Sequence, residues 1–189
     1  MQSPFIQNVV GTETRGVSQR EGSVNATVRY LIDNSILSLN QGYSVEDLIS
    51  PLIPMNDAHL VLGLEPLETI RNLKYISKQT VVILNSHKHY PRNVIIGSEQ
   101  KKIYPSTSDI MKILYQYAKK VIFLDFHELS KVKLNNSIYA NSIILGRGLK
   151  EFTNIFDKNL MITIIKEFFK DSEKNLDAFE IGYNLISEI

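Results

Sequence analysis

Three short apolar runs divide the middle of the chain. They cover His59–Leu64, Thr80–Leu84 and Val121–Leu124, and each is bounded by polar residues or by proline. Apolar runs of four to six residues between turn-forming residues are typical of strands that are buried on both faces. The pattern therefore predicts three buried strands in the central part of the chain.

Helical spacing of apolar residues follows the strand-like runs and continues towards the end of the chain. Pro66 suits the first turn of a helix, where its missing N–H costs nothing. Ser106 or Ser108 is expected to cap the next helix. Further helical patterns cover Ile138–Phe152, Leu160–Phe169 and Lys174–Ile189. Alternation of strands and helices predicts a three-layer α/β/α, Rossmann-like fold with a mainly parallel sheet.

The N-terminal part has a different pattern. Phe5–Val10 resembles a strand, Gly11–Gly22 is polar and predicted to be a loop, and Ser23–Leu31 alternates with a period of two. The alternating residues on its apolar face are Val24, Ala26, Val28 and Tyr30. This alternation is typical of a half-buried strand.

Composition excludes several classes of function. The formal net charge is +1, with basic residues spread along the chain, which does not favour nucleic-acid binding. There is no cysteine, so the chain cannot form a disulfide, use a thiol nucleophile or ligate an iron–sulfur cluster through cysteine. No apolar run reaches membrane-spanning length, and Met1–Val10 does not resemble a signal peptide. We expect a cytoplasmic protein and a single domain over residues 1–189.

The polar segment 11–24 carries the most suggestive chemistry. Arg15 and Arg20 suit a phosphate or carboxylate group, and glycines at 11, 16 and 22 allow close backbone approach. The same arginines could instead pair with Glu13 and Glu21 in a solvated loop. The spacing alone does not decide between the two interpretations.

Other candidate residues are weaker. His87 and His89 have a spacing that can hold zinc, but no third ligand is close in sequence, so a solvated loop is favoured. Asp125, with His127 and Glu128, could suggest acid–base chemistry, but a helix cap at Asp125 is favoured. The sequence therefore predicts neither a catalytic residue nor a metal site.

Segments in order along most of the chain match a known family. The first match comprises Glu13, Gly16, Gln19, Arg20, Gly22, Ser23 and Val24. Later matches are 50–54, 58–68, Tyr104-Pro105, Asn141, Leu145-Gly146 and 174–179. On these residues the chain resembles the gamma-type domain (domain III) of 2-oxoacid:ferredoxin oxidoreductases such as pyruvate:ferredoxin oxidoreductase. Within that family it is most similar to the small (beta) subunits of indolepyruvate ferredoxin oxidoreductases.

The resemblance implies an accessory subunit that is not catalytic alone. It implies that thiamine diphosphate and iron–sulfur clusters lie on partner subunits, with ferredoxin as an indirect partner. This chain would hold no cofactor by itself but would contribute to coenzyme A binding. The implied contacts are Arg15, Gln19, Arg20, Ser23 and Glu65. We expect a hetero-oligomer, to which copies of this chain could add a homo-oligomeric contact.

Three departures from the family pattern matter. The family histidine is Arg15 here, a family glycine is Glu21, and an N-terminal strand with a Gly-x-Gly-Gly-Gln-Gly turn into a helix is absent from this sequence. Such a turn is a natural phosphate cradle. The alternative hypothesis is therefore a stand-alone binding or interaction domain that kept the fold and lost the enzyme role.

Overall fold

A three-stranded parallel sheet forms the centre of the molecule. The computed structural model describes residues 6–15, 24–32, 50–88 and 104–186, without the side chain of Arg15. The sheet has the order β3 (Leu60–Gly63), β4 (Val81–Asn85) and β5 (Lys120–Leu124). Both strand pairs are parallel and in uninterrupted register. The carboxyl ends of all three strands therefore meet at one edge of the sheet.

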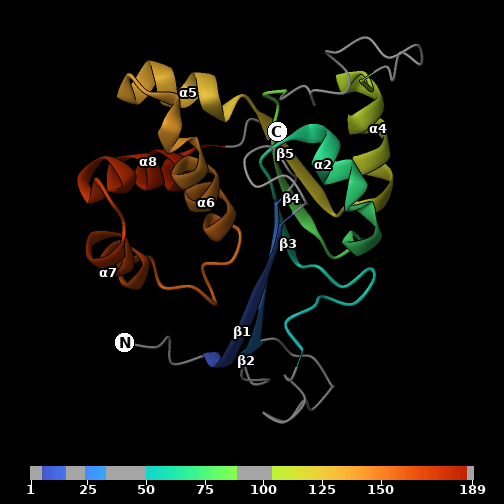
Figure 1. Cartoon of the computed structure of the whole chain (residues 1–189), viewed down its shortest axis with the longest axis horizontal. Helices are drawn as coiled ribbons and strands as arrows, with labels where there is room; N and C mark the ends of the chain where they lie inside the picture. The colour runs from blue at the N-terminus through green and yellow to red at the C-terminus, as the bar shows by residue number, and fades with distance from the viewer. Residues whose placement is uncertain (1–5, 16–23, 33–49, 89–103, 187–189) are drawn as a thin grey trace.

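Helices cover both faces of this sheet (Figure 1). One face carries α2 (Pro66–Arg71) and α4 (Thr107–Tyr117), and the other carries the C-terminal helices. These are α5 (Phe126–Leu134), α6 (Ala140–Lys150), α7 (Lys158–Phe168) and α8 (Ser172–Asn184). Single 3-10 turns, η2 (Leu73–Tyr75) and η3 (Ser137–Tyr139), follow α2 and α5. The predicted three-layer arrangement is confirmed.

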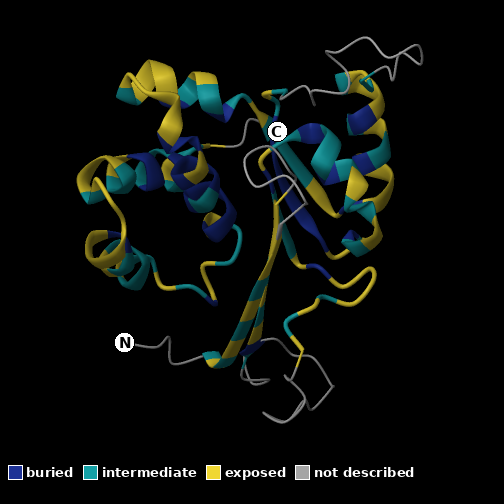
Figure 2. Ribbon diagram, in the orientation of Figure 1, coloured by how far each residue is buried: buried dark blue, intermediate teal, exposed yellow. Residues whose placement is uncertain are grey.

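β4 supplies the centre of the core because every one of its residues is buried (Figure 2). Successive side chains of a strand point to opposite faces. Val81 and Ile83 accordingly pack with residues of α5, α6 and α8, whereas Val82 and Leu84 pack with residues of α4. The continuous apolar run in the sequence therefore serves two hydrophobic clusters, one in each layer.

Two helix starts follow the predicted caps. The Ser106 hydroxyl accepts the N–H of Asp109 at 3.1 Å, and the Asp125 carboxylate accepts the N–H of Glu128 at 2.8 Å. Ile110 and Leu114 of α4 and Ala118 directly after it are buried, whereas Tyr117 is exposed. His59, expected within a buried strand, is exposed at the amino end of β3.

β1 (Ile6–Arg15) and β2 (Val24–Ile32) form an antiparallel ribbon that is separate from the central sheet. The prediction of a loop beginning at Gly11 was wrong, because β1 continues to Arg15, which lies opposite Val24. Cross-strand pairing supplies the backbone hydrogen bonds that keep these five polar residues extended. The segment predicted to bind a ligand thus starts and ends on paired strands.

The more buried face of β2 is the one that carries Thr27, Arg29 and Leu31, although Tyr30 on the opposite face packs edge-on against Phe156. Thr27 donates a hydrogen bond to the carbonyl of Pro51 at 2.9 Å, and Arg29 donates to the carbonyl of Ser50 at 2.7 Å. On the other face Val24 and Val28 are 56% and 45% exposed. A half-buried strand normally buries its apolar side, so this part of the expectation was wrong. The hydrogen bonds to the 50–51 backbone explain the reversed orientation.

Among the described residues, no helix has both the length and the apolar character needed to cross a membrane.

Candidate functional site at the carboxyl edge of the parallel sheet

The carboxyl edge of the sheet gathers polar side chains from three separate segments. Glu65 follows β3, Asn85 ends β4 and Asp125 follows β5. Because ligands of open parallel sheets bind beyond the carboxyl ends of the strands, this edge is the candidate site. Its side chains fall into two groups, one around Glu65 and one around Asn85.

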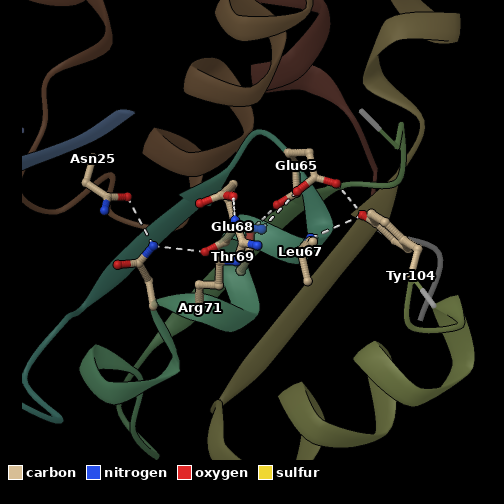
Figure 3. A network of polar contacts seen from close by, with 8 residues as sticks. Asn25, Glu65, Leu67, Glu68, Thr69, Arg71 and Tyr104 are labelled. Carbon is tan, nitrogen blue, oxygen red and sulfur yellow. Dashed lines mark hydrogen bonds and ion pairs between the residues drawn. The ribbon is translucent and has the colours of Figure 1, made fainter. Parts of the chain in front are cut away.

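The Glu65 carboxylate caps α2 and accepts two hydrogen bonds (Figure 3). Its Oε2 accepts the N–H of Glu68 at 2.8 Å, and its Oε1 accepts the hydroxyl of Tyr104. That hydroxyl in turn accepts the N–H of Leu67 at 3.2 Å. The predicted strand-end position of Glu65 is confirmed. Its carboxylate stabilises the start of α2, and its predicted role at the coenzyme A site stays a prediction.

The same network connects α2 to the β1–β2 ribbon. The Asn72 side chain donates to the carbonyl of Glu68 at 2.9 Å and to the side chain of Asn25 at 3.0 Å (Figure 3). Asn25 is the second residue of β2 and lies directly after the segment predicted to bind a ligand. The ribbon therefore lies beside the helix that Glu65 caps.

The structure describes only the backbone of Arg15 among the other predicted site residues. Arg15 is the last residue of β1, and its side chain is not described. Gln19, Arg20 and Ser23 lie outside the described residues. The structure thus places Arg15 opposite Val24 and does not test the contacts predicted between these two positions.

Asn85 is the centre of the second group and was missed by sequence analysis. It is fully buried, its Oδ1 accepts the N–H of Phe126 at 3.0 Å and that of His87 at 3.3 Å, and its Nδ2 donates to the carbonyl of Leu64 at 3.2 Å. One side chain thereby joins the ends of all three parallel strands. A polar residue at the end of an apolar run was the available signal.

His87 and His127 meet beside Asn85. Their rings stack with centroids 4.4 Å apart, and Nδ1 of His127 lies 2.6 Å from Nδ2 of Asn85. Ring nitrogens of both histidines and a carboxylate oxygen of Asp125 all lie within 4.8 Å of one another. His87 and the Asp125–His127 motif are separate in the sequence, although both follow parallel strands whose ends share one edge. Their proximity could therefore not be predicted from the spacing near His87, whereas the predicted cap at Asp125 is confirmed.

Comparison with protein-family models identifies the family of this chain. The family model described as pyruvate ferredoxin/flavodoxin oxidoreductase matches residues 7–185. The chain belongs to this family. The match includes the ribbon, the parallel sheet and all the C-terminal helices described above. The resemblance inferred from the sequence motifs is therefore confirmed.

Two relatives of this chain are named as subunits of indolepyruvate oxidoreductase. The chain is 31% identical over 179 residues to indolepyruvate oxidoreductase subunit IorB of Archaeoglobus fulgidus, covering 94% of this chain and 80% of that protein. It is 27% identical over 183 residues to subunit IorB of Methanothermobacter thermautotrophicus, covering 96% and 84%. These matches favour an accessory subunit of a multi-subunit oxidoreductase over a stand-alone domain.

Solved structures support the fold. The gamma subunit of a keto/oxoacid ferredoxin oxidoreductase from Geobacter sulfurreducens matches with a TM-score of 0.54 at 13% identity, covering 93% of this chain and 78% of that one. Pyruvate oxidoreductase subunit PORC from Thermotoga maritima matches with a TM-score of 0.55 at 14% identity and the same coverage. At these identities the likeness establishes the fold alone.

Three charged side chains, Lys120, Arg147 and Glu151, meet near the amino end of β5. The Glu151 carboxylate lies 2.6 Å from the buried guanidinium of Arg147 and 2.9 Å from the ammonium of Lys120. Burial by itself raises the pKa of Glu151, but the hydrogen bonds and charges of Lys120 and Arg147 outweigh it, and the pKa lies below its ordinary value of 4.5. Glu151 therefore stabilises the fold only while it is ionised.

We expect Glu151→Gln to lower the free energy of unfolding at pH 7 by about 1.5–3 kcal/mol, which is the scale of a hydrogen bond to a charged group. The exposed Lys120 contact adds little. Because the pKa is lowered in the folded state, this stabilisation is complete above pH 4.5 and is lost as the pH falls through the lowered pKa. Urea unfolding of both proteins between pH 3 and pH 7 measures this. A stability difference that is unchanged or larger at the acidic end would contradict it.

Proposed function

We propose that this chain is the accessory subunit of a thiamine-diphosphate-dependent 2-oxoacid:ferredoxin oxidoreductase that acts on indolepyruvate or a similar arylpyruvate. The observation that carries the proposal is the family match over residues 7–185, together with IorB relatives that align with at least 94% of this chain. Thiamine chemistry and electron transfer through iron–sulfur clusters belong to partner subunits in this proposal. The absence of cysteine from the chain is consistent with that division.

The proposed contribution of this chain is to bind part of coenzyme A and to pack beside the thiamine-binding subunit. Arg15 and Arg20 supply positive charge to the segment between the paired residues Arg15 and Val24. Guanidinium groups bind phosphate oxygens in a bidentate manner, which suits the phosphates of coenzyme A. Glu65, after the end of β3, would help to shape the binding site.

Arg20→Ala is expected to raise the KM for coenzyme A of the assembled enzyme about tenfold, the equivalent of losing one charge-assisted contact of ~1.4 kcal/mol. The kcat should change less than twofold, because the reacting groups lie on another subunit. Steady-state assays at saturating 2-oxoacid and ferredoxin measure both constants. Lys112→Ala, on the exposed side of α4, is the control and should leave both unchanged. An unchanged KM in Arg20→Ala would show that Arg20 does not contact coenzyme A.

The substrate class is tested with the assembled enzyme. Ferredoxin reduction is followed with indolepyruvate, phenylpyruvate, pyruvate and 2-oxoglutarate, each in the presence of coenzyme A. The proposal predicts that kcat/KM is at least tenfold higher for the two arylpyruvates. A preference for pyruvate or 2-oxoglutarate would contradict the substrate class while leaving the family membership intact.

A further inference from the structure

The orientation of the Asn85 amide is determined by three backbone groups. Its Oδ1 faces the N–H groups of Phe126 and His87, and its Nδ2 faces the carbonyl of Leu64. Reversing the amide would place NH₂ against two N–H donors and an oxygen against a carbonyl oxygen. Because Asn85 is fully buried, no bulk solvent could compensate for the loss of these hydrogen bonds. The Nδ2 donor is therefore fixed on the side that meets His127.

This orientation sets the tautomer of His127. The Asn85 Nδ2 lies 2.6 Å from the His127 Nδ1, so Nδ1 accepts a hydrogen bond and carries no proton. A neutral imidazole has one donor and one acceptor nitrogen, and the hydrogen bond made by one of them decides the state of the other. The proton of neutral His127 is therefore on Nε2, which makes that nitrogen a hydrogen-bond donor.

A donor Nε2 does not suit a metal ion. A histidine that binds a metal through Nε2 usually donates its Nδ1–H to an acceptor, and Asn85 presents a donor at that position. Zinc binding through the His127 Nε2 would therefore require the Asn85 amide to move away from Nδ1.

We propose that Asn85 is a positioning residue that fixes His127 as an Nε2–H donor, and that His87, Asp125 and His127 therefore do not form a site for a divalent metal ion. The support for this is the set of Asn85 hydrogen bonds, which does not depend on the proposed function.

The tautomer is tested on the full chain labelled with ¹⁵N-histidine. Long-range ¹H–¹⁵N correlation spectra at neutral pH distinguish a protonated from an unprotonated ring nitrogen, and the spectrum of His127→Gln assigns the His127 signals by their loss. We expect an unprotonated Nδ1 and a protonated Nε2. A protonated Nδ1 with an unprotonated Nε2 would overturn the proposal.

Zinc binding is tested by equilibrium dialysis and calorimetry. Wild-type protein should not bind zinc at one ion per chain with affinity that depends on His87 and His127. Tight one-to-one binding that is lost in both His87→Gln and His127→Gln would overturn the proposal. Asn85→Asp presents an acceptor to Nδ1, so it should bind zinc at least tenfold more tightly than wild type, provided that its circular dichroism spectrum matches. If that variant does not fold, the tautomer and the wild-type titration decide the matter.

Discussion

Gly146→Ala and Gly182→Ala are each expected to lower the free energy of unfolding by about 3 kcal/mol or more, at the upper end of the usual cost of overpacking a core. A Cβ on Gly146 would lie 2.1 Å from the carbonyl oxygen of Phe179, and one on Gly182 would lie 1.9 Å from that of Ile143. Both obstacles are backbone atoms, which cannot rotate away. Helices α6 and α8 would have to separate, which would disturb the buried side chains of Ile143 and Phe179.

Urea unfolding followed by circular dichroism measures this loss. Gly11→Ala is the matched control, since its Cβ would lie 3.4 Å from the nearest atom, the carbonyl oxygen of Thr27, and should cost less than about 1 kcal/mol. Equal midpoints for wild type, Gly146→Ala and Gly182→Ala would show that α6 and α8 are not in backbone contact.

Asn85→Leu is expected to destabilise the protein by about 3–5 kcal/mol, because the side chains have similar size but leucine cannot hydrogen-bond. The substitution leaves the buried N–H of Phe126 without its partner, which costs about 1–3 kcal/mol. It also removes the part-buried hydrogen bonds to the N–H of His87 and the carbonyl of Leu64, each worth about 0.5–1.5 kcal/mol. Thermal and urea unfolding give the change in free energy.

Asn154→Leu provides the comparison, because Asn154 is exposed in the segment between α6 and α7. It should alter stability by no more than about 0.5 kcal/mol. If Asn85→Leu were as stable as Asn154→Leu, the three strand ends would not depend on the amide. The candidate site would then have no fixed centre, and the proposed tautomer of His127 would lose its support.

The layers of the fold could be predicted because their signals are local. The apolar run at 80–84 becomes β4, whose complete burial needs helices on both sides. Ser106 and Asp125 cap helices as expected, since a cap depends only on the residues within the next turn. These elements fix the order of strands and helices without long-range information.

The ribbon could not be predicted to the same degree. Alternation in β2 showed two faces, but the face that docks is decided by hydrogen bonds from Thr27 and Arg29 to residues some twenty positions away. Periodicity contains no information about such partners. For the same reason the continuation of β1 to Arg15 was missed, because its polar residues are extended through pairing with β2.

The contacts of the candidate site could not be predicted from the sequence. Glu65, Asn85 and Asp125 each lie at or just after the end of a parallel strand, so the strand order brings them to one edge. That Asn85 would join them, and that His87 would stack on His127, depends on side-chain directions that spacing cannot give. The residues implied by the family resemblance, from Arg15 to Ser23, stay predictions.

Co-purification tests the central claim, that this chain works as a subunit of a larger oxidoreductase, most directly. The chain carrying an affinity tag is recovered from its native source without oxygen, and the retained proteins are identified by mass spectrometry. The account predicts stoichiometric recovery of a larger thiamine-diphosphate-binding subunit with iron–sulfur clusters, together with 2-oxoacid-dependent reduction of ferredoxin. Recovery of the tagged chain alone, at the mass of its own monomer or homo-oligomer and without that activity, would contradict it.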